Sequence, residues 1–180
     1  MIDLTKKALP NTITVGGRAY SIYTDYRVWM RFVIEVGKMQ PGELIDTSYL
    51  WKNDYPKHQT IDELLEFAAP KSELPRNIGN GCEGVIPLDY ELDSDLIYSA
   101  FLGQYGIDLV DIEELHWWKF LALIKGLNDS TRLKEIMGYR CYQKSDGKSD
   151  IYEQLKRAWE IVKISPQEQA ELDELNRIFK

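Results

Sequence analysis

The chain has 180 residues, a net charge of -7, and 44% hydrophobic and 12% aromatic residues. This length favours one domain, and the apolar content is enough for a core, which excludes wholesale disorder. The acidic balance argues against general binding to a nucleic-acid backbone, which requires clustered Lys and Arg. No apolar run is long enough to span a membrane.

The first elements are expected close to the N-terminus. Residues 12–15 and 18–22 alternate in polarity on either side of a Gly-Gly pair, which is typical of a β-hairpin. A helix is predicted to follow as far as about Val36, capped by Thr24 or Asp25.

The middle of the chain is less regular. A short helix is predicted over 43–51, and a capping box at Thr60–Glu63 opens another that ends at Pro70. Residues 71–87 carry Pro and Gly without a period, so we expect a mobile loop there. The glycines of this loop do not form a nucleotide-binding motif.

The densest apolar run lies over 110–125 and predicts a helix buried between other elements. A helix over 93–105, ended by Gly106, precedes it, and we expect the two to form an antiparallel pair. Cap chemistry at 129–131 predicts a short helix afterwards.

The C-terminal part predicts two more helices, an amphipathic one over 150–163 and a last one opened by the signature at 165–168. The expected fold is therefore mainly α, with six or seven helices and one small hairpin. We expect residues 1–142 to form the core domain and 143–180 a helix pair packed on that domain.

Few residues suggest chemistry. Glu113 and His116 form one Glu-x-x-His unit, whereas carboxylate-bridged di-iron sites need two such units. The only other histidine is His58, so we expect His116 to pack or to form hydrogen bonds. A metal-dependent enzyme using Glu113 and His116 remains an alternative. No hydrolase motif is present, and we expect no catalysis, cofactor or metal.

The two cysteines and the paired tryptophans have simpler interpretations. Cys82 and Cys141 lie in no metal-binding or CxxC spacing, so we expect two free thiols in a reducing compartment. Trp117 is expected in the core. Trp118 falls nearer the polar edge of its predicted helix, where it could contact a partner.

Two blocks of the chain, residues 9–36 and 86–142, include the strings TDYRVW, HWWKF and EIMGYR. Both blocks resemble a family of bacteriophage proteins called gene product fifteen. The family occurs in phages and prophages of Gram-positive bacteria and is encoded in the tail module, just before the tape-measure gene.

This resemblance implies a tail assembly chaperone that works in the host cytoplasm. It would bind the long apolar tape-measure protein, with other tail proteins as further candidate partners, and without cofactor, nucleic acid or membrane. A structural component of the phage tail is the alternative. The residues predicted to contact the partner are Trp118, Trp159, Leu172, Leu175 and Phe179.

Overall fold

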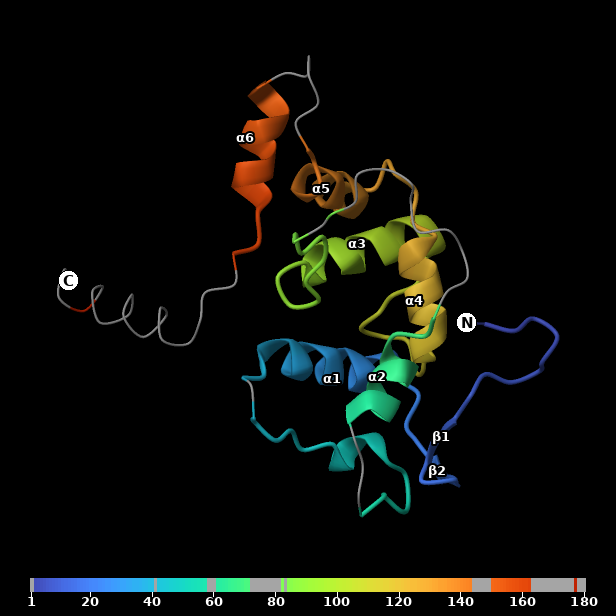
Figure 1. Cartoon of the computed structure of the whole chain (residues 1–180). Helices are drawn as coiled ribbons and strands as arrows, with labels where there is room; N and C mark the ends of the chain where they lie inside the picture. Colours follow the sequence, from blue (N-terminus) through green and yellow to red (C-terminus); the bar gives the residue numbers. More distant parts are fainter. Residues whose placement is uncertain are drawn as a thin grey trace. The chain divides into compact units, whose positions relative to one another are not determined.

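The computed structural model describes residues 2–40, 42–57, 61–71, 82, 84–143, 150–162 and 177. Within these ranges the chain forms six α-helices and one two-stranded sheet, which confirms the mainly α fold (Figure 1). In chain order the elements are β1 (Thr12–Val15), β2 (Arg18–Ser21), α1 (Tyr26–Lys38), the 3-10 helix η1 (Ser48–Leu50), α2 (Ile61–Ala68), α3 (Ser94–Tyr105), α4 (Trp117–Lys125), α5 (Arg132–Arg140) and α6 (Asp150–Trp159).

The chain divides into two compact units. Unit 1 comprises Met1–Ile78 and Tyr90–Glu135, and unit 2 comprises Gly79–Asp89 and Ile136–Lys180. The packing of a C-terminal helix pair onto the core domain stays a prediction.

The N-terminal hairpin is confirmed. β1 and β2 pair antiparallel, with Thr12 opposite Ser21. The two glycines between the strands have φ of 57° and 82°, a left-handed backbone that glycine adopts at low cost. β1 contacts α2 and buries its two β-branched aliphatic side chains, which gives the hairpin the support that an isolated pair of strands lacks.

The predicted helix over 43–51 is largely absent. Only η1 forms there, because Asp46 accepts a hydrogen bond from the Ser48 backbone N–H and organises a tight turn. Most of the predicted mobile loop 71–87, the cap residue Thr60 and the last helix predicted after 165–168 lie outside the described residues.

The prediction of a helix over 110–125 is wrong at its N-terminal end, because α4 begins only at Trp117. The arrangement with α3 also differs. Gly106 ends α3 in a left-handed conformation, as predicted, but an irregular segment of eleven residues, 106–116, separates the two helices. Figure 1 shows α4 crossing α3 at a steep angle, and not running antiparallel to it.

Side chains hold the segment before α4 out of helical conformation. The Asp108 carboxylate accepts from the backbone N–H of Val110 at 2.9 Å. The carbonyl of Leu109 accepts from the Tyr26 hydroxyl at 2.6 Å and from the Arg27 guanidinium at 3.0 Å. Such bonds give the backbone an alternative to the helix ladder, and two of them come from α1, far away in sequence.

The core of unit 1 is built around Phe120, which is fully buried. Its ring stacks on Tyr26, Phe101 and Trp117 at centroid distances of 4.9, 5.1 and 5.5 Å. Stacked rings of this kind add to the free energy of burying their large apolar area. Helices α1, α3 and α4 therefore meet in one aromatic cluster.

The expectation of two free thiols is wrong for this structure. Cys82 and Cys141 form a disulfide within unit 2, with their Cα atoms 4.7 Å apart. Sequence spacing could not reveal this pairing, because 59 residues separate the two cysteines and only the tertiary fold brings them together.

Trp117→Ala is expected to lower the free energy of unfolding by about 3–5 kcal/mol, because this ring is 1% exposed and its removal leaves a cavity. Leu102→Ala is the control, since Leu102 is 43% exposed and should change stability by only about 0.5 kcal/mol. Urea unfolding followed by circular dichroism measures both. Equal effects of the two substitutions would contradict the core position of Trp117.

Candidate functional site

The candidate site lies where the first residues of α1 and α4 run side by side. The Tyr26 backbone N–H donates to the Leu115 carbonyl at 2.8 Å, and the Trp117 N–H donates to the Thr24 carbonyl at 2.7 Å. These bonds frame an antiparallel bridge between Asp25 and His116. The first residue of α1 therefore bonds to the segment just before α4, and the first residue of α4 bonds to the segment just before α1.

Asp25 accepts hydrogen bonds from both segments, the start of α1 and the residues before α4. One carboxylate oxygen accepts from the Arg27 N–H at 3.0 Å and so caps α1. The other accepts from the Leu115 N–H at 3.1 Å. Since the first N–H groups of a helix have no partner within the helix, the carboxylate is well placed there, both as an acceptor and as a negative charge.

His116 performs the equivalent task for α4. Its Nδ1 accepts from the Trp118 N–H at 3.0 Å, and its Nε2 lies 2.9 Å from the Pro10 carbonyl oxygen. An accepting Nδ1 assigns the proton to Nε2, which then donates to Pro10. Burial lowers the pKa of His116 below its usual 6.5, in keeping with a neutral ring.

This geometry does not provide the metal site considered for Glu113 and His116. The two residues precede α4, so they are not one turn apart on a helix. Both ring nitrogens of His116 already have hydrogen-bond partners. No group of three or more His, Cys, Asp and Glu side chains within the described ranges could hold a metal ion. His58 is outside those ranges.

The two adjacent tryptophans hold the C-terminal end of α2. The Trp117 indole N–H donates to the Ala68 carbonyl at 2.8 Å, and that of Trp118 donates to the Phe67 carbonyl at 2.9 Å. The last carbonyls of a helix lack partners within the helix, so the two indoles satisfy two of them. Trp117 is buried, as predicted, whereas Trp118 is half-buried.

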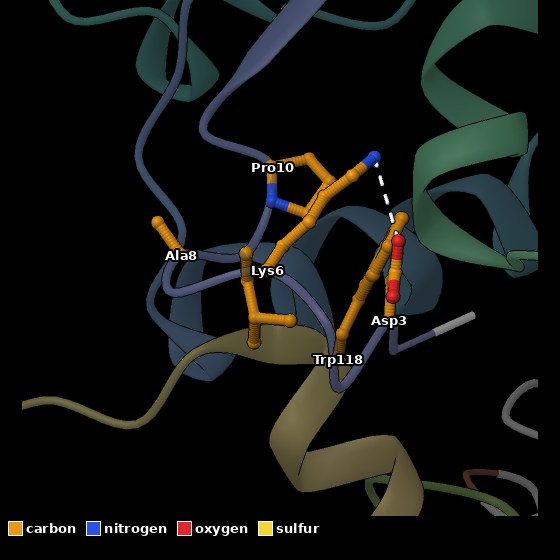
Figure 2. Close-up of a pocket in the computed structure, with 6 residues that line it drawn as sticks. Asp3, Lys6, Ala8, Pro10 and Trp118 are labelled. Carbon is orange, nitrogen blue, oxygen red and sulfur yellow. Dashed lines mark ion pairs between the residues drawn. The ribbon is translucent and has the colours of Figure 1, made fainter.

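The half-buried Trp118 forms one wall of a pocket of about 400 Å³ in unit 1. The other lining residues come from the N-terminal segment: Asp3, Lys6, Ala8, Leu9 and Pro10. Figure 2 shows the Lys6–Asp3 ion pair, 3.5 Å long, beside the Trp118 ring. The Trp118 indole N–H is occupied by Phe67, so an apolar surface of the ring is what this pocket offers.

The predicted partner-contacting residues are not all in view. Trp159 is half-buried at the end of α6, in unit 2, whereas Trp118 belongs to unit 1. Leu172, Leu175 and Phe179 lie outside the described residues, so their role stays a prediction. Sequence reasoning also missed Asp25 as a partner of Leu115, although the same side chain was predicted as a helix cap.

α6 differs from the other helices in its burial. None of its side chains is buried, and Ile151 and Tyr152 are 62% and 46% exposed. The Tyr152 ring contacts those of Tyr139 and Tyr142 within unit 2, at 6.2 and 5.3 Å. An amphipathic helix with this much apolar exposure is suited to contact with another chain.

Within the described residues, Asp25, His116 and the indoles of Trp117 and Trp118 cap helix ends or join segments. The chain belongs to the bacteriophage Gp15 protein family, whose model matches residues 5–164. This is a structural phage family not known for catalysis, and membership indicates a structural or tail-related phage protein.

No curated protein and no solved structure matches the chain. Within the described ranges, no helix is long and apolar enough to cross a membrane.

Asp25→Ala is expected to lower the free energy of unfolding by about 2–4 kcal/mol, because it removes the α1 cap and leaves the Leu115 N–H without its acceptor. The control is Asp129→Ala, which alters an exposed carboxylate. Chemical unfolding measures both variants. A loss no larger than that of the control would show that the shared carboxylate contributes little.

His116 should make stability depend on pH. Its pKa is lowered in the folded chain, so the unfolded chain takes up the proton first. The stabilisation is complete above about pH 6.5 and is lost as the pH falls through the folded pKa. His116→Asn keeps a capping acceptor but does not titrate.

We therefore expect wild type to lose more free energy of unfolding than His116→Asn between pH 7.5 and 5.5. The contribution of His58 is common to both proteins and cancels in the comparison. Equal losses would show that the neutral ring is not required.

Proposed function

We propose that this protein is a phage tail assembly chaperone that binds the tape-measure protein and assists assembly of the tail tube. Membership of the bacteriophage Gp15 family supports a tail-related role. The observation that carries the binding role is α6, an amphipathic helix without a buried side chain.

The exposed apolar stripe of α6 consists of Ile151, Leu155 and Ala158. Their spacing of four and three residues puts them on one side of the helix. Ile151 is 62% exposed, Leu155 is half-buried and Ala158 is exposed. A stripe of this kind normally faces a core, and here it is accessible to an apolar helix of another protein.

A different side of α6 fixes it in unit 2. The Lys156 ammonium donates to the Tyr142 carbonyl at 2.9 Å, and the Trp159 carbonyl accepts from Arg140 at 2.7 Å. Because these contacts orient the helix, the stripe is presented in a defined direction, and less conformational entropy is lost on binding.

The proposed partner is a long, apolar helical protein that would aggregate alone. Binding would cover its apolar face, while the net charge of -7 would keep the complex soluble. Trp118, Trp159, Leu172, Leu175 and Phe179 are the further residues that we propose to contact this partner, each by itself. The proposed place of action is the host cytoplasm during phage assembly.

A structural component of the tail is the second candidate, because family membership is equally compatible with it. The two functions differ in the finished particle. An assembly chaperone is absent from purified virions, whereas a structural component is present in stoichiometric amounts. Mass spectrometry of purified particles distinguishes them.

The direct test is co-purification with the tape-measure protein of the same tail gene cluster. We expect a complex that Leu155→Glu weakens about tenfold or more, because a charge would be buried in an apolar contact. Arg157→Gln is the matched control: it also changes the net charge by -1, at an exposed position off the stripe.

No complex with wild type would contradict the chaperone role. A complex weakened equally by both variants would contradict the assignment of the stripe.

A further inference from the structure

Four consecutive residues, Tyr139 to Tyr142, lie at the centre of the contacts within unit 2; we call them the 139–142 hub. The rings of Tyr139 and Tyr142 contact Tyr152 of α6. Arg140 donates to the Pro87 carbonyl at 3.1 Å and to the Trp159 carbonyl at 2.7 Å. Cys141 is bonded to Cys82. The hub thus contacts α6, Cys82 and Pro87.

Arg140 is the polar centre of the hub. It is only 3% exposed, and a buried guanidinium is stable only while its donors have acceptors. Two of those acceptors are backbone carbonyls, from Pro87 and Trp159. The placement of the segment before Pro87 and that of the end of α6 are therefore linked through one side chain.

The disulfide is the covalent tie of the same hub. Cys82 and Cys141 are the only cysteines of the chain, and both are half-buried, so small thiols and disulfides can reach them. A bond five residues from Pro87 keeps its carbonyl close to Arg140 at a high effective concentration. Without the bond, the Arg140–Pro87 hydrogen bond loses this covalent support.

We propose that Cys82–Cys141 is a redox-operated latch, which holds Cys82 and residues 84–87 on the 139–142 hub when oxidised and loosens them when reduced. In a reducing compartment the two residues are thiols, and the segment is then held by the Arg140–Pro87 hydrogen bond without the covalent tie. Since Arg140 also bonds Trp159, reduction loosens the end of α6 as well.

The oxidant that closes the latch is a low-molecular-weight disulfide such as oxidised glutathione. One cysteine thiolate attacks it, forming a mixed disulfide and releasing one glutathione thiolate. The second cysteine thiolate then attacks the protein sulfur of the mixed disulfide, closing Cys82–Cys141 and releasing the second glutathione thiolate. Two protein thiols are oxidised, one glutathione disulfide is reduced, and the two cysteine protons pass to the released thiolates or to solvent.

The test is amide hydrogen exchange on the full wild-type chain, after equilibration with either oxidised glutathione or a phosphine reductant. We expect the amides of residues 84–86, 88–89 and 157–160 to exchange about tenfold faster in the reduced protein, because local opening becomes easier. The amides of α1 serve as an internal reference and should not change. Intact mass after thiol alkylation assigns the redox state of each sample.

Cys82→Ser is the matched variant. It should exchange like the reduced wild type in both buffers, which separates the effect of the bond from any effect of the reductant. Equal exchange of residues 84–86 and 88–89 in oxidised and reduced wild type would overturn the proposal. Complete alkylation of both cysteines after treatment with oxidised glutathione would also overturn it. Both outcomes are independent of any partner, so they do not depend on the proposed chaperone role.

Discussion

The structure of unit 1 depends on the hydrogen bonds that join the start of α1 to the start of α4, which we call their mutual capping. Asp25 caps α1 and accepts from Leu115, while His116 caps α4 and donates to Pro10. The bonds from Arg27 to Asp25 and from Trp118 to His116 satisfy N–H groups that a helix leaves open at its start. The bonds of Leu115 and Pro10 join the segments around them. Because α1 and α4 are fixed at this point, their aromatic side chains meet at Phe120 and the core of unit 1 follows from one junction.

What could be predicted from the sequence was encoded locally. The Gly-Gly pair marked the hairpin, Asp25 marked the start of α1, and Gly106 marked the end of α3. The start of α4 could not be predicted, because Tyr26 and Arg27 hold the preceding segment from a distance in sequence. The disulfide was missed for the same reason, since no local signal reports that two distant cysteines meet.

In the candidate site, too, features encoded locally could be predicted and those set by distant residues could not. The apolar spacing predicted that Trp117 is in the core and that Trp118 is nearer an edge, and both positions agree with their burial. The partners of the two indoles, the last carbonyls of α2, carry no side-chain signature and were not predictable. His116 was predicted to pack or to form hydrogen bonds, but its acceptor at Pro10 lies in a segment without any motif.

Hydrogen exchange at single residues would test the mutual capping most directly. The amides of Tyr26, Leu115 and Trp117 each donate across the junction between the start of α1 and the start of α4. We expect them to be protected to the same degree as the interior of α1, so that they exchange only when unit 1 unfolds. Exchange at the rate of an exposed loop, with the interior of α1 still protected, would show that the junction opens independently and does not hold the fold.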